Sequence, residues 1–282
     1  MNAIRSVVNK FLNKFKSSKC QIVNLGAGYD TLFMNLIDQN NTPTKYIEID
    51  FPRVVSSKIR LIRSKKNLAE KFQFKTEEPT TTKPVETNSV FKLPTPTANF
   101  ARNEMNEINL ENFSLISVDL RRINDLDRKL SECNIDRSLP TLFISECVLV
   151  YMSAQDSSVL LQHLATTFSQ CCFLKYEQCN LNDKFGEIML ENMQLRSCKL
   201  LGVEVCESIE TQKNSFINNG FDSKLCQVIT MTNYYQNIMN KNERERIESI
   251  EFLDEAELLF QLLDHYCICL AANNQSLNDI FL

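Results

Sequence analysis

The sequence predicts an α/β fold in which a mainly parallel sheet of seven strands is covered by helices on both faces. Short apolar runs alternate along the chain with segments whose apolar residues recur every three to four positions, as in successive β-α units. The first run, 21–30, is QIVNLGAGYD and ends on two glycines and an acid. The next run, KYIEID at 45–50, ends on an acid as well. These two runs predict neighbouring strands whose carboxyl ends share a crevice.

The predicted strands are apolar, rich in β-branched and aromatic residues, and bounded by polar segments. The run that begins at Thr141 follows Pro140, breaks at Glu146 and then stays apolar. The last two strands flank helical sequence, so we expect them to pair and to add an antiparallel strand. In chain order the predicted strands lie within 21–25, 45–50, 112–119, 141–152, 171–179, 224–231 and 265–273.

The predicted helices carry apolar residues at helical spacing. Ser153 is the expected N-cap of one helix and Gly220 the expected stop of another. The segment 53–75 is rich in Lys and Arg, which indicates a solvated face or, as the alternative, a partner-binding face. Residues 76–112 are rich in Pro, Thr and Asn and predict a long, flexible loop. The helices lie within 4–15, 53–75, 121–133, 153–168, 183–200, 207–221 and 243–263.

Length and composition predict a single domain over 1–282. A chain of 282 residues with 43% hydrophobic residues can bury one large core. A net charge of −4 supplies no basic field for nucleic acid. The 11 cysteines include no C-x-x-C pair, and only two histidines accompany them, so they indicate buried thiols in a reducing compartment. No continuous apolar stretch is as long as that of a signal peptide or long enough to span a bilayer. We therefore expect a cytoplasmic monomer.

The glycine turn after the first strand predicts a cofactor site. Gly26 and Gly28 let the backbone approach a ligand closer than any side chain would allow. An acid at the end of the second strand contacts ribose hydroxyls in doubly wound sheets, and Glu48 and Asp50 both lie where that acid is expected. A dinucleotide oxidoreductase is disfavoured because Thr31 stands where its fingerprint requires a small residue. S-adenosylmethionine, which carries no phosphate, is favoured instead.

Further polar groups follow the third and fourth strands. Asp119 with Leu120 ends one strand, and Glu146 ends the other. Carboxylates without a histidine can hold Mg²⁺, which is the alternative interpretation. A nucleoside fits better: one acid would contact ribose hydroxyls, and Asp119 with a backbone amide would contact adenine. We therefore predict an adenosyl site and no metal site.

Seven segments, in order, closely resemble the leucine carboxyl methyltransferase family: QIVNLGAGYDT, KYIEIDFPRVVSSKI, VDLRRINDL, LPTLFISECVLVYM, KYEQCNLNDKFGEIMLENM, IESIEFLDEAELL and HYCICLAAN. The resemblance covers most of residues 20 to 273 except the proline- and threonine-rich loop. It implies a class I S-adenosylmethionine-dependent methyltransferase (Rossmann-like) fold. It also implies methyl transfer to the C-terminal leucine α-carboxylate of the protein phosphatase 2A catalytic subunit.

The resemblance places the family's cofactor contacts on Gly26, Asp50, Asp119 with Leu120, and Glu146. It thereby selects Asp50 over Glu48 as the ribose acid. Family members also carry an N-terminal segment with a lysine and an arginine that bind the methionine carboxylate of the cofactor. This chain begins directly before the helix that leads into the first strand, so the alternative is a catalytically impaired relative that binds cofactor or phosphatase.

The implied reaction needs no general base, because a chain-terminal carboxylate is already ionised at neutral pH. Catalysis then consists of holding the carboxylate and the methyl group in line and excluding water. The substrate carboxylate still needs hydrogen-bond donors. Arg121, next to the adenine pair, and Tyr151, just past Glu146, are the candidates. A surface arginine and a core tyrosine are the alternative interpretations.

Overall fold

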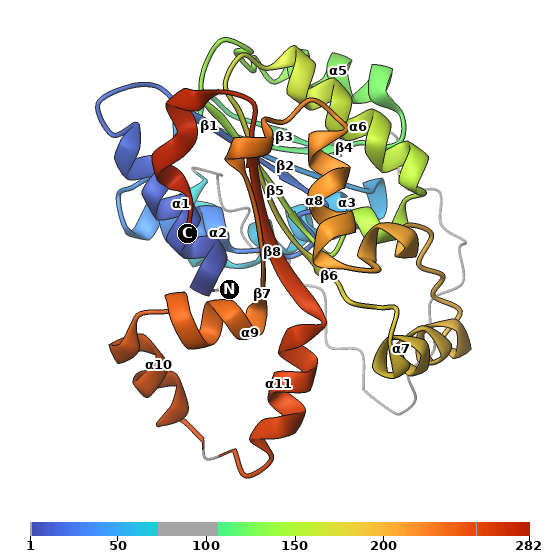
Figure 1. The fold of residues 1–282 in the computed structure, drawn as a ribbon. Coiled ribbons are helices and arrows are strands. Elements are labelled where there is room, and N and C mark those ends of the chain that lie inside the picture. Colours follow the sequence, from blue (N-terminus) through green and yellow to red (C-terminus); the bar gives the residue numbers. More distant parts are fainter. Residues whose placement is uncertain (1, 73–106, 252) are drawn as a thin grey trace, which may run out of the picture.

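A sheet of eight strands runs through the described part of the chain, residues 2–72, 107–251 and 253–282 of a computed structural model (Figure 1). The strand order is β3-β4-β2-β1-β5-β6-β8-β7. The strands are β1 (Gln21–Leu25), β2 (Lys45–Asp50), β3 (Ile108–Asn109), β4 (Phe113–Ser117), β5 (Thr141–Glu146), β6 (Cys171–Gln178), β7 (Cys226–Thr230) and β8 (Tyr266–Ala272).

The sheet is mostly parallel, as predicted. Strands β4, β2, β1, β5 and β6 are parallel, and β8 runs antiparallel between β6 and β7. The prediction of seven strands was wrong by one, because β3 pairs antiparallel with β4. β3 lies in the segment predicted as a loop, 76–112. The greater part of that segment is outside the described residues.

Helices cover both faces of the sheet (Figure 1). α1, α2 and α3 pack on one face, while α5, α6 and α8 pack on the other. α9, α10 and α11 extend beyond the carboxyl ends of the parallel strands, and α7 also lies at this end of the molecule. The helices are α1 (Asn2–Lys14), α2 (Leu32–Asp38), α3 (Pro52–Ser64), α4 (Lys66–Lys71), α5 (Ile123–Glu132), α6 (Ala154–Thr167), α7 (Lys184–Leu195), α8 (Ile209–Ile217), α9 (Met231–Asn233), α10 (Lys241–Glu248) and α11 (Ala256–Asp264).

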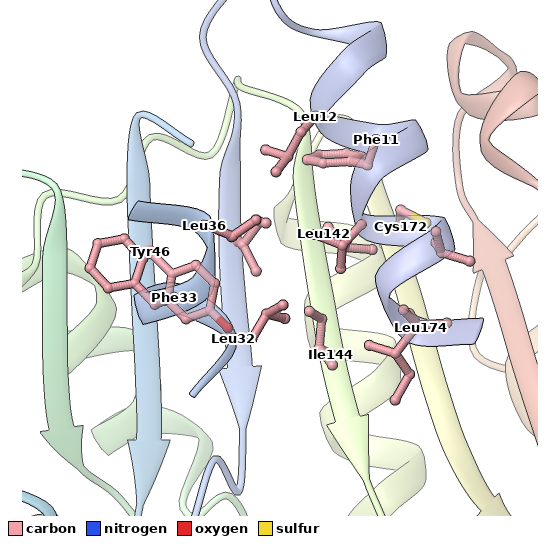
Figure 2. Packing of buried hydrophobic residues seen from close by; sticks show 14 of the residues in the cluster. Phe11, Leu12, Leu32, Phe33, Leu36, Tyr46, Leu142, Ile144, Cys172 and Leu174 are labelled. Atoms are coloured by element: carbon pink, nitrogen blue, oxygen red, sulfur yellow. The ribbon is translucent and has the colours of Figure 1, made fainter. Parts of the chain in front are cut away.

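The core is divided by the sheet because successive strand residues point to opposite faces. Phe11 and Leu12 of α1 pack over Leu142 and Cys172, which belong to β5 and β6 (Figure 2). Phe33 of α2 lies beside Tyr46 of β2 in the same layer, and its ring stacks on Phe113 at 4.6 Å between centroids. The intervening strand residues pack against α5, α6 and α8. Both helix layers therefore fix the sheet and its strand ends.

Several helix boundaries differ from the prediction. The seven-residue helix α2 was not predicted. The helix expected over 53–75 breaks at Lys65, whose φ of −110° and ψ of 110° are extended. The helix expected within 243–263 is two helices, α10 and α11. Neither buries a side chain, so no core contact favours one continuous helix. Ser153 is the N-cap of α6, as predicted, and its hydroxyl accepts the amide of Asp156 at 3.1 Å.

Candidate functional site

The predicted cofactor residues lie along one edge of the sheet. Leu25 of β1 pairs with Ile49 and with Ser145, so Gly26 follows β1 between Asp50 on one side and Glu146 on the other. Asp50 pairs with Ser117, two residues before Asp119. Neighbouring strands are about 4.8 Å apart. The acids and the glycine turn therefore form one row across the ends of four adjacent parallel strands.

The glycine turn is tied to the end of β2. The amides of Gly26 and Ala27 donate to the carbonyl oxygen of Ile49 at 2.8 and 3.0 Å. Gly26 has a φ of +68°, and a Cβ built there would lie 2.4 Å from Cγ2 of Val148. Gly28 has a φ of +49°, but a Cβ there would meet nothing within 4 Å. Gly26 is required both by its contact with Val148 and by its positive φ, whereas Gly28 is required by its positive φ alone. Open space remains beside Gly28.

The two acids of β2 have different environments. Asp50 is half-buried at the edge, where its Oδ2 accepts the amide of Gly28 and its Oδ1 that of Phe51, both at 2.7 Å. Glu48 is 2% exposed and pairs with Nζ of Lys58 at 2.7 Å. Burial raises the pKa of Glu48 to about 7, while Lys58 opposes the shift. Of these two acids, only Asp50 is at the crevice.

Two further residues support the glycine turn: Asp30, the acid that ends the first predicted run, and Lys58, whose role the sequence did not indicate. Asp30 accepts the side-chain amide of Asn24 at 2.8 Å and the backbone amide of Leu32 at 3.0 Å. Lys58 of α3, besides pairing with Glu48, donates to the backbone carbonyl of Asp30 at 2.7 Å. Lys58 belongs to the segment predicted to have a solvated basic face, yet it is 3% exposed. Nothing in the pattern of Lys and Arg residues over 53–75 distinguishes Lys58 from the exposed ones.

Asp119 and Arg121 form a bidentate pair beyond the end of β4. Nε of Arg121 donates to Oδ1 of Asp119 at 2.9 Å, and its Nη2 donates to Oδ2 at 2.6 Å. Hydrogen bonds from Arg121 lower the pKa of Asp119, which is therefore ionised at neutral pH. Leu120, which lies between them in the sequence, is buried. The guanidinium is exposed and lies at the outer rim of the row of acids.

β5 ends in a tight turn that carries Glu146 and Tyr151. Burial raises the pKa of the half-buried Glu146, and the charge of Asp30 adds to the shift. Cys147 follows with a φ of +51°, which is uncommon outside glycine. The 3-10 helix η1 (Leu149–Tyr151) completes the turn, and Tyr151 is 43% exposed. The turn thus presents one acid and one phenol on the side of the sheet edge opposite Asp50 and Asp119.

A cavity of about 310 Å³ lies beside this turn, between α6, α8 and the 3-10 helix η2 (Val203–Cys206). Leu149 and Val150 line it, as do the buried Lys175, Glu177 and Gln212. The predicted cofactor residues do not line it. Within the described residues, no cluster of His, Cys, Asp and Glu has the arrangement of a metal site. The described helices include none that is long and apolar enough to cross a bilayer.

Comparison with known proteins assigns the family. The leucine carboxyl methyltransferase family model matches residues 2–165. Leucine carboxyl methyltransferase 1 of Bos taurus is 39% identical over 276 residues, which are 98% of this chain and 76% of that protein. The protein of the same name from Caenorhabditis elegans is 39% identical over 266 residues, 94% of this chain and 73% of its own length.

The fold is shared with more distant methyltransferases. A crystal structure assigned as a methyltransferase from Thermobifida fusca YX superposes with a TM-score of 0.54 over 96% of this chain and 79% of that chain, at 11% identity. At this identity the likeness concerns the fold alone. Family model, relatives and fold agree, so the chain belongs to the leucine carboxyl methyltransferase family and is a methyltransferase.

Proposed function

We propose that this protein binds S-adenosylmethionine and transfers its methyl group to the C-terminal leucine α-carboxylate of the protein phosphatase 2A catalytic subunit. The observation that carries the proposal is the unbroken row of Asp119, Asp50, the glycine turn and Glu146 in a chain of this family. The described strands form one sheet with helices on both faces, which supports a single methyltransferase domain over 1–282. Eleven free thiols favour the cytoplasm, a reducing compartment, and we propose that the protein acts there as a monomer.

The residues present fit the proposed cofactor. The carboxylate of Asp50 is fixed by two backbone amides and keeps lone pairs for ribose hydroxyls. The open space beside Gly28 leaves room for a ligand at the same place. Asp119 with Leu120 accounts for adenine on the side of β4, and Glu146 offers an acceptor for the ammonium of the methionine part on the side of β5. The row is thus acidic where the cofactor carries hydroxyls and cationic groups.

When bound, S-adenosylmethionine supplies a methyl group on a sulfonium, to which the leucine carboxylate oxygen forms a bond as the carbon–sulfur bond breaks. The protein has to orient the carboxylate and exclude water. Arg121 and Tyr151 are our candidates for the donors that hold the carboxylate. Both are partly exposed at the rim of the crevice. Arg121 can donate to a second carboxylate while it stays paired with Asp119, because the guanidinium has five N–H donors.

The decisive experiment measures transfer of labelled methyl from S-adenosylmethionine to intact phosphatase catalytic subunit. Ester formation on the native subunit, and none on a subunit that lacks its terminal leucine, is the expected result. Binding of S-adenosylhomocysteine, measured by calorimetry, tests the cofactor site separately. Cofactor binding without any transfer would contradict the enzymatic proposal and assign a binding relative instead.

The donor assignment has a matched control. We expect Arg121→Ala and Tyr151→Phe to lower methyl transfer roughly 10- to 100-fold, the effect of one lost charge-assisted hydrogen bond, with little change in affinity for S-adenosylhomocysteine. Arg122→Ala removes the neighbouring guanidinium, which is more exposed and pairs with Asp125, and it should leave transfer unchanged. An equal loss in Arg121→Ala and Arg122→Ala, or a parallel loss of cofactor affinity, would refute the assignment.

A further inference from the structure

A buried carboxylate anchors the turn that carries Glu146 and Tyr151. Glu177, near the end of β6, is 1% exposed. Its Oε2 accepts the backbone amide of Val150 at 3.1 Å. The amides of Leu149 and Val148 also stabilise its ionised form. Three consecutive N–H groups at the start of η1 therefore face one side chain from a neighbouring strand.

The turn that Glu177 contacts lies between the glycine turn and the cavity. Its first residue, Cys147, has a left-handed φ of +51°. On one side Val148 lies against Gly26, and on the other side the buried Leu149 and Val150 border the 310 Å³ cavity. A shift of the turn would move Glu146, Tyr151 and the contact with Gly26 together.

We propose that Glu177 is a positioning residue of this methyltransferase: its ionised carboxylate fixes the turn 147–151 and so sets the places of Glu146 at the cofactor and Tyr151 at the substrate. The anchoring follows from the contacts themselves. Its consequence for methyl transfer rests on the proposed function, because it takes the roles of Glu146 and Tyr151 from there.

The anchor is titratable. Burial raises the pKa of Glu177 to about 7, while Lys175 and the turn amides oppose the shift. Oε1 is buried and, within the described residues, has no hydrogen-bond partner, so it can accept a proton without losing a bond. Protonation leaves Oε2 a neutral, weaker acceptor for the turn amides. The turn should therefore be held more firmly above neutral pH than below it.

The other groups that face Glu177 do not titrate in this range. They are thiols and phenols from the turn, from η2 and from β8, and burial raises the pKa of each: Cys147, Tyr151, Cys206, Tyr266 and Cys269. The ammonium of Lys175, two residues before Glu177 on β6, is the charged group among the neighbours that influence it. It lies over the Phe216 ring at 4.7 Å and donates to Gln212.

Hydrogen exchange on the wild-type chain tests the anchor without substrate. The exchange rates of the Val148, Leu149 and Val150 amides are measured between pH 6 and 8. The protection factor of each amide is the rate in an unstructured peptide divided by the measured rate. Protection should rise roughly tenfold across this range, the difference between a neutral and a charged acceptor. Phe143, in the middle of β5, is the internal reference and should show no such rise. Unchanged protection at 148–150, or the same rise at Phe143, would overturn the proposal.

Two variants extend the test to activity. Glu177→Gln keeps a carbonyl acceptor without the charge, so it should fix the turn at its low-pH protection and remove the pH dependence of methyl transfer between pH 6 and 8. Lys175→Met removes the charge that lowers the pKa, so it should move the midpoint of the exchange profile to higher pH. A pH profile of transfer that is the same in Glu177→Gln and wild type would refute the link to activity. Absence of transfer in wild type would instead refute the proposed function and leave the exchange result standing.

Discussion

The contact between Gly26 and Val148 gives the sharpest test of how the crevice is built. In Gly26→Ala, the new Cβ would lie 2.4 Å from Cγ2 of Val148, and the residue would keep a φ of +68°. A non-glycine residue in the left-handed region costs about 1 to 2 kcal/mol. Overpacking against a stiff β-branched side chain adds about 1 to 3 kcal/mol. We therefore expect the free energy of unfolding to fall by about 2 to 5 kcal/mol.

Gly28→Ala is the matched control, because its φ is also left-handed but its Cβ would meet no atom within 4 Å. It should cost only the backbone term, about 1 to 2 kcal/mol. Urea unfolding measures both variants, and the double variant Gly26→Ala, Val148→Ala should recover part of the excess. Equal losses at the two glycines, or no recovery in the double variant, would show that the contact with the turn is not what requires glycine.

Three further predictions concern a buried ion pair, a helix cap and two buried acids. Lys58→Met should lower the free energy of unfolding by about 3 to 5 kcal/mol at pH 8, since it leaves Glu48 buried without its cation; an effect below 1 kcal/mol in urea unfolding would contradict this role. Asp183 caps α7 and contacts His265, the C-cap of α11, at 3.1 Å, so Asp183→Ala should lower the free energy of unfolding by about 1 to 2 kcal/mol, measured by thermal unfolding. Replacing the exposed Lys184 by Ala should be neutral. Burial raises the pKa of Glu48 and of Glu177 from 4.5 to about 7. Between pH 4.5 and about 7, the folded chain therefore holds more protons than the unfolded chain. The free energy of unfolding should therefore decrease as pH rises through this window, and replacing both acids by glutamine should flatten the curve; a rise with pH would refute the assignment.

The parallel part of the fold could be predicted because its strands are long apolar runs. The same patterns cannot find elements that span only one or two periods. β3 has two residues and α2 has seven, so neither repeats a pattern often enough to stand out. The continuous helix predicted within 243–263 failed for the opposite reason: its apolar spacing is helical, but α10 and α11 bury no side chain. Periodicity reports which face could be buried and does not report whether anything covers it.

The row of strand-end residues was predictable for a different reason. Parallel strands end at one edge, so Asp50, Asp119 and Glu146 are brought together by topology alone. What spacing could not decide was which acid of β2 faces the crevice. Glu48 and Asp50 differ by two positions and share a face of the strand. Which acid is free to face the crevice depends on Lys58 of α3, because Lys58 pairs with Glu48. No local sequence pattern indicates this pairing.

Glu48 and Glu177 now have a common place in the fold. Each is a buried acid close to the carboxyl end of a parallel strand, Glu48 on the face of α3 and Glu177 on the face of α8. Glu48 holds Lys58, which supports the glycine turn through Asp30, and Glu177 holds the turn after β5. Buried carboxylates are unfavourable unless they are paired, and both are near their pKa at neutral pH. The edge that carries the proposed cofactor site is thus held from both faces of the sheet by charges, which weaken when the pH falls by one unit. As the pH rises through neutrality, we therefore expect the crevice to be held more firmly while the free energy of unfolding decreases.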